Sequence, residues 1–123
     1  MEQFILMFGL DKDKEKAVRT VCSRIGAVPV TVERRDYSQK LGTLAGVQGC
    51  SRDKTVSSGP NFPAEMLVFS GMNSTQVDVF LAEYKKTGVP AVGLKAIVTP
   101  HNVFWTAEAL FKELLKEHLH MSK

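Results

Sequence analysis

An unbroken apolar run, followed at once by a helix-start pattern, limits the folds open to this chain more than any other feature. The run Met66-Leu67-Val68-Phe69 ends at Ser70-Gly71. Continuous rather than alternating apolar residues are typical of a strand that is covered on both faces. Asn73 and Gln76 then have the spacing of a capping box, which predicts the beginning of a helix.

The predicted helix has one apolar face. Its apolar residues recur at i, i+3, i+4 and i+7, which directs a stripe toward a core: Val77, Phe80, Leu81 and Tyr84. Gly88 is placed to end this helix, and Val89-Pro90 favours an extended chain that leads into a second apolar strand at residues 91–98. The stretch therefore predicts a βαβ unit.

The first part of the chain repeats the same plan. A strand at 4–8 precedes a helix that begins at Asp11 or Asp13 and ends at Gly26, and a second strand follows at 28–32. Pro29 favours either an edge position or the start of a strand. Ser38 can cap a short helix, and a last helix begins at Thr106. We expect a single α/β domain in the order βαβαβαβα, with a four-stranded, mostly parallel sheet and helices packed on its faces.

Length and composition agree with one globular domain over residues 1–123. The chain has 44% hydrophobic and 24% charged residues. No apolar run approaches the roughly 18 residues that span a bilayer, and no signal-peptide pattern is present. Cys22 and Cys50 have no framework spacing, which predicts free thiols. We expect a cytoplasmic protein without membrane contact and with a flexible loop at about residues 49–63.

The turn after the last predicted strand is the candidate ligand site. Ligands of open α/β sheets bind beyond the carboxyl ends of the strands. Asn102 offers a donor and an acceptor, and Trp105 offers a flat apolar wall with one N–H donor. In the alternative interpretation, Asn102 satisfies the turn backbone and Trp105 fills the edge of the sheet. The candidate ligand-binding residues are Lys95, Thr99, His101, Asn102 and Trp105.

Lys95 interrupts an apolar strand and allows two interpretations. A buried ammonium would have a lowered pKa and would need an anion, whereas an exposed one would extend its stem to water. In a shared site Lys95 would supply positive charge, Asn102 would orient a polar group and Trp105 would stack above it.

Cys50 is a candidate reactive thiol, because Arg52 and Lys54 beside it could lower its pKa. A nucleophilic Cys–His pair would need His101 as the base. The histidines lack metal-ligand spacing, and the glycines form no phosphate-binding motif. From the sequence we assign no catalytic residue, no metal and no cofactor.

Two segments resemble a small bacterial family of unknown function. They are Glu65–Gly71 (E-M-L-V-F-S-G) and Leu94–Pro100, with Asn102 and Trp105-Thr106 behind them. The family pattern is similar to E-M-L-V-F-x-G, an amphipathic helix, L-K-A-V-L-T-P-x-N-x-x-W-T and a closing helix. Leu41-Gly42-x-Leu44 is similar to its middle segment, but the specific part of the resemblance is the second half of the chain.

Some members of that family carry an amidinotransferase label, which implies a cysteine nucleophile. The resemblance places Ser70 where relatives have a cysteine, so a catalytic thiol at this position is in doubt. Enzymes of that class resemble a much larger α/β propeller with a Cys, a His and paired acids, a set that this chain does not offer in recognisable spacing.

Three functions follow from these observations. The leading hypothesis is a small binding or regulatory domain whose partner is a small molecule or a protein, and a homo-oligomer is compatible with it. The alternative is a small enzyme acting on a guanidino or amine substrate. The second alternative is weak nucleic-acid binding, which the net charge of +3 favours only slightly, through Arg34, Arg35, Arg52 and Lys54.

Overall fold

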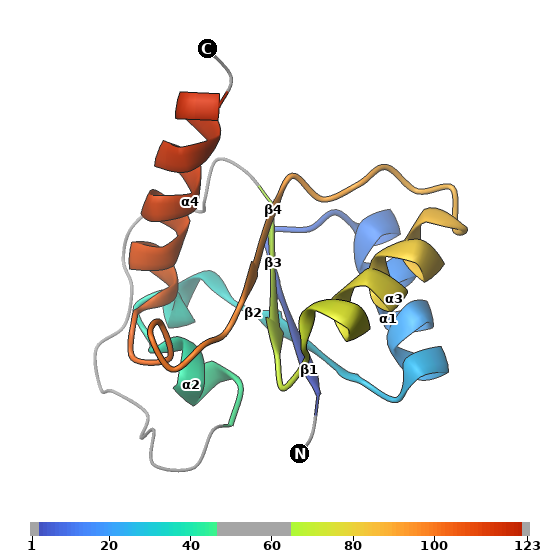
Figure 1. The fold of residues 1–123 in the computed structure, drawn as a ribbon, viewed down its shortest axis with the longest axis horizontal. Coiled ribbons are helices and arrows are strands. Elements are labelled where there is room, and N and C mark those ends of the chain that lie inside the picture. Colours follow the sequence, from blue (N-terminus) through green and yellow to red (C-terminus); the bar gives the residue numbers. More distant parts are fainter. Residues whose placement is uncertain (1–2, 47–64, 122–123) are drawn as a thin grey trace.

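The computed structural model of the chain describes residues 3–46 and 65–121. These residues build one four-stranded sheet with helices on both faces (Figure 1). The elements are, in chain order, β1 (Phe4–Phe8), α1 (Lys12–Ile25), β2 (Val28–Val32), the 3-10 helix η1 (Arg34–Asp36), α2 (Leu41–Leu44), β3 (Met66–Ser70), α3 (Ser74–Lys85), β4 (Leu94–Ile97) and α4 (Ala107–Met121). The predicted α/β class is confirmed, and η1 is an addition to the predicted order.

The strands are arranged in the order β2-β1-β3-β4. β1 is parallel to β2 and β3 is parallel to β4, whereas the central pair β1–β3 is antiparallel. The predicted mostly parallel sheet is therefore confirmed, and it consists of two parallel βαβ halves that run in opposite directions. The carboxyl ends of β3 and β4 lie at the opposite end of the sheet from those of β1 and β2.

Side-chain burial explains which strands are central. Residues 5–8 of β1 and all of β3 are buried, because both strands carry apolar side chains on both faces. β2 lies at one edge of the sheet. Pro29 has no backbone N–H to donate, and an edge strand tolerates this better than a central strand does. β4 lies at the other edge and exposes Lys95. Of the two alternatives that Pro29 left open for the strand at 28–32, the structure shows the edge position.

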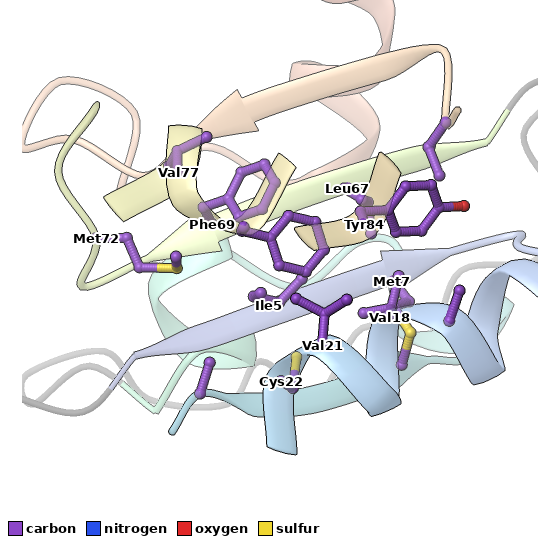
Figure 2. Close-up of a cluster of buried hydrophobic side chains, with 14 residues drawn as sticks. Ile5, Met7, Val18, Val21, Cys22, Leu67, Phe69, Met72, Val77 and Tyr84 are labelled. Carbon is purple, nitrogen blue, oxygen red and sulfur yellow. The ribbon is translucent and has the colours of Figure 1, made fainter. Parts of the chain in front are cut away.

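The sheet separates two hydrophobic cores. The α1/α3 core lies between the sheet and helices α1 and α3, and Figure 2 shows its side chains converging from both helices onto β1 and β3; it includes Ile5, Val18, Val21, Cys22, Phe69 and Phe80. The α2/α4 core lies on the other face and includes Leu6, Phe8, Tyr37, Leu41, Val68, Leu110 and Phe111. Alternate residues of each central strand thus enter different cores.

The helix ends follow the predicted signals. Asp11 caps α1 by accepting a 2.8 Å hydrogen bond from the amide of Lys14, and Gly26 ends α1 with a φ of 78°. Asn73 and Gln76 form the predicted capping box of α3, because each side chain accepts from the other's backbone amide, at 2.9 and 2.8 Å.

Two predicted boundaries are wrong. β4 begins at Leu94 rather than near residue 91, because the preceding chain is held against α3, where the Tyr84 hydroxyl donates to the carbonyl of Pro90 at 2.9 Å. α2 begins at Leu41 with Lys40 as its N-cap, not at Ser38, because η1 and the turn after it take up the preceding residues. The predicted loop at 49–63 lies outside the described residues.

Within residues 3–46 and 65–121, no helix is both long enough and apolar enough to cross a membrane.

Candidate functional site

The turn at residues 99–105, between β4 and α4, is closed by its own side chains. Asn102 accepts a 2.8 Å hydrogen bond from the amide of Thr99 with Oδ1 and donates from Nδ2 to the carbonyl of Ile97 at 3.0 Å. The Thr99 hydroxyl accepts from the amides of His101 and Asn102, both at 3.2 Å. Asn102 therefore satisfies the turn backbone, which is the architectural alternative that the sequence left open.

A second set of hydrogen bonds fixes this turn to the segment before α2. The amides of Leu41 and Gly42 donate to the carbonyls of Trp105 and Val103 at 2.8 and 2.9 Å, and Lys40 and Thr106 form an antiparallel bridge. The first turn of α4 continues this pairing to Gln39 and Tyr37. The 99–105 turn thus lies beside α2 (Figure 1), although the two are far apart in the sequence.

The outer surface of the turn is aromatic. Phe104 is 63% exposed, and His101 is exposed as well. Trp105 is half-buried: it packs against the α2/α4 core, and its ring lies 5.6 Å from that of His101. Sequence reasoning missed Phe104. A signal was present, because three consecutive large apolar residues in a turn cannot all point inward, and these are Val103, Phe104 and Trp105.

Lys95 lies away from this surface. It is paired in register with Leu67, whose side chain belongs to the α1/α3 core, so Lys95 projects from the same face of the sheet. Its side chain is exposed and donates to the carbonyl of Val92 at 2.7 Å. Trp105 packs on the opposite face. The structure therefore brings Thr99, His101, Asn102 and Trp105 together and leaves Lys95 outside; ligand binding by any of them stays a prediction.

The thiols differ in how far they can be placed. Cys22 is fully buried in the α1/α3 core, and this burial raises its pKa to about 11, against a smaller lowering effect of Arg19. Its thiolate is therefore scarce near neutral pH. Cys50 lies outside the described residues, together with Arg52 and Lys54, so its predicted reactivity stays a prediction.

The arginines considered for nucleic-acid binding lie on the surface. Arg34 and Arg35 are exposed, and Arg35 pairs with the exposed Glu33 at 2.9 Å. Within residues 3–46 and 65–121, no three His, Cys, Asp and Glu side chains gather closely enough to hold a metal ion.

A partly buried ion pair connects the two βαβ halves. The Lys14 ammonium lies 2.5 Å from Glu65 Oε2, and the two side chains are only 15% and 24% exposed. The hydrogen bond to Glu65 raises the pKa of Lys14, partly opposed by burial. Burial raises the pKa of Tyr84, whose hydroxyl donates a hydrogen bond to the carbonyl of Pro90. Lys14, Glu65 and Tyr84 lie at the end of the sheet opposite the 99–105 turn.

Residues 65–121, a little under half of the chain, match the family model described as a domain of unknown function (DUF3783). The match contains both segments that suggested an uncharacterised family, and that expectation is confirmed; it gives no support to the amidinotransferase label. No curated protein matches the chain, and no solved structure matches it either.

Proposed function

We propose that this protein is a cytoplasmic binding domain that recognises a partner protein through the 99–105 turn. Phe104, Trp105 and His101 would contact the partner, while Thr99 and Asn102 hold the turn in shape. The observation that carries the proposal is a 63% exposed phenylalanine on a turn whose backbone is fixed from two sides.

The rigidity of the turn favours binding. Association costs free energy when loops and side chains must become ordered, and a turn that is already fixed avoids part of this cost. The contacts of Asn102 within the turn and those of Leu41 and Gly42 to its far end provide such a fixed backbone.

The composition of the surface favours a protein partner over a small molecule. Aromatic residues are enriched at the centres of protein interfaces and supply many of their strongest contacts. Small-molecule sites are concave. Two hollows in the described part of the chain lie along α1, and neither of them is lined by residues of the turn.

Site-specific photo-crosslinking in the native cell tests the proposal. A photo-reactive phenylalanine analogue at position 104 should capture one discrete partner, which mass spectrometry would identify. The matched control places the analogue at position 79 on α3, because Val79 is also a half-exposed apolar residue, at 50%. A second copy of this chain is one outcome, and it would make the turn a self-association surface.

Affinity measurements with the captured partner complete the test. Phe104→Ala should weaken binding roughly tenfold or more if the ring is a central contact. Val79→Ala should leave the affinity unchanged. Equal crosslinking from both positions, or an affinity that ignores Phe104→Ala, would refute the proposal.

A further inference from the structure

A groove runs between helix α1 and the turn that follows α3. It has a volume of about 520 Å³ and is lined by Asp13, Lys16, Ala17, Thr20, Arg24, Thr87, Gly88, Val89 and Pro90. This volume is within the range of roughly 300–1,000 Å³ that small-molecule sites occupy. None of the candidate site residues discussed above belongs to it.

One wall of the groove is cationic. Lys16, Thr20 and Arg24 are exposed and follow each other at i, i+4 and i+8, so they form one stripe along α1. The same three residues border an adjoining hollow on the other side of the stripe. Among the described residues, no carboxylate forms an ion pair with Lys16 or Arg24.

The opposite wall is apolar and fixed in place. The Thr87 hydroxyl donates to the carbonyl of Tyr84 at 2.7 Å and accepts from the amide of Val89 at 3.2 Å. The Tyr84 hydroxyl donates to the carbonyl of Pro90. Hydrogen bonds thus hold both ends of the turn against α3. Val89 and Pro90 therefore line the groove in a fixed position, and ligand binding needs no rearrangement of this wall.

Charge is unevenly distributed along the groove. Asp13 lies at the amino-terminal end of the α1 stripe and Arg24 lies at the other, about 16 Å away along the helix axis at 1.5 Å per residue. Arg24 also lies near Glu83, whose carboxylate is already paired with Lys86 at 2.9 Å. An anionic group is therefore favoured beyond Asp13, between Lys16 and Arg24.

We propose that this groove binds a small organic anion with an apolar body. Its carboxylate or phosphate would lie between Lys16 and Arg24, which supply the positive charge; the Thr20 hydroxyl between them already donates to the carbonyl of Lys16 at 3.0 Å. Its apolar part would cover Ala17, Val89 and Pro90. The site is separate from the 99–105 turn, so it stands or falls independently of the protein contact proposed there.

Three matched probes test the site by ¹H–¹⁵N NMR titration: 1-naphthyl phosphate, 1-naphthoate and the uncharged 1-naphthol. The anions should shift the amide signals of Thr87, Gly88 and Val89, and the tighter anion identifies whether carboxylate or phosphate is preferred. Naphthol should bind at least tenfold more weakly than the tighter anion, because a charged hydrogen bond is lost. Equal binding of naphthol would overturn the proposal.

Charge-matched variants separate this groove from general attraction to a basic helix. Lys16→Gln and Arg24→Gln should each weaken binding of the tighter anion roughly tenfold. Lys12→Gln removes the same charge from an exposed residue of α1 that does not line the groove, and it should leave the affinity unchanged. Equal losses in all three variants, or shifts confined to amides outside the groove, would overturn the proposal. All three positions are exposed, so the melting temperature should stay at that of the wild type.

Discussion

The backbone amide of Leu41 donates a 2.8 Å hydrogen bond to the carbonyl oxygen of Trp105. This bond joins the first residue of α2 to the turn before α4, and the bridge between Lys40 and Thr106 continues the contact. The conformation of the 99–105 turn therefore depends on the first half of the chain as well as on the turn's own side chains. Both dependences can be tested.

The internal support of the turn comes chiefly from Asn102. Asn102→Ala removes the bonds to Thr99 and Ile97, and we expect the free energy of unfolding to fall by about 1–2 kcal/mol. Urea denaturation followed by circular dichroism measures this change. Asn102→Asp keeps the acceptor for the Thr99 amide and loses the donor, so it should lie between wild type and Asn102→Ala. An unchanged urea midpoint in Asn102→Ala would show that the turn does not need this side chain.

Trp105 is the only tryptophan of the chain, so its fluorescence reports on the turn alone. Because Trp105 is half-buried, we expect an emission maximum between those of buried and free indole, with partial quenching by acrylamide. Trp105→Ala should cost less than the roughly 3–5 kcal/mol expected for Phe69→Ala, whose ring is fully buried. Complete protection of Trp105 from acrylamide would instead assign it to the core and remove it from the proposed contact surface.

The buried thiol of Cys22 predicts a loss of stability in alkali. The folded protein keeps the thiol protonated up to a pKa of about 11, whereas the unfolded chain loses this proton near the usual 9.0. Since the unfolded state binds fewer protons in that window, stability falls as the pH rises from about 9 to 11, by roughly 2–3 kcal/mol from this group.

Cys22→Ala provides the comparison for this effect, because it removes the thiol and leaves every other titrating group. The difference in unfolding free energy between wild type and Cys22→Ala should shrink as the pH is raised from 8 to 11. A difference that is constant over this range would exclude a protonated, buried Cys22.

The ion pair between Lys14 and Glu65 is expected to stabilise the fold by about 1 kcal/mol, because both groups are largely shielded from solvent. Glu65→Gln should lower the unfolding free energy by that amount. Because the pair raises the pKa of Lys14, its contribution is complete below the usual 10.5 and is lost as the pH rises through the raised value.

Glu33→Gln is the matched control for this ion pair. The Glu33–Arg35 pair is exposed, with side chains that are 63% and 68% accessible, and we expect a change close to zero. Thermal unfolding without guanidine measures both variants. If Glu33→Gln and Glu65→Gln lower the stability equally, the Lys14–Glu65 ion pair does not stabilise the fold more than an exposed one.

The strands and helices could be predicted from local sequence patterns. Apolar runs located the strands, and Asn73 with Gln76 located the start of α3, because these patterns act through neighbouring residues. The antiparallel pairing of β1 with β3 was not readable, since it depends on contacts between distant segments. The start of β4 was misplaced for the same reason: the bond from Tyr84 holds the preceding chain on α3.

Part of the arrangement of the candidate residues could be predicted, while their role in binding stays a prediction. His101, Asn102 and Trp105 lie close together because they belong to one turn. The sequence also grouped Lys95 with them, although the side-chain alternation of β4 directs that lysine to the other face. The support from Leu41 could not be foreseen, because a backbone hydrogen bond between distant segments leaves no mark on side-chain chemistry.

The antiparallel contact between β1 and β3 makes the molecule resemble a heterodimer whose two subunits share one chain. Residues 3–46 and 65–121 each hold one βαβ half, and either half alone would expose the edge of its inner strand and one side of both cores. Separate peptides covering these halves should therefore be poorly structured alone and should reassemble when mixed, as in fragment complementation. The segment that matches the family model, residues 65–121, contains only one of these halves. Its inner strand and both cores are completed here by residues 3–46.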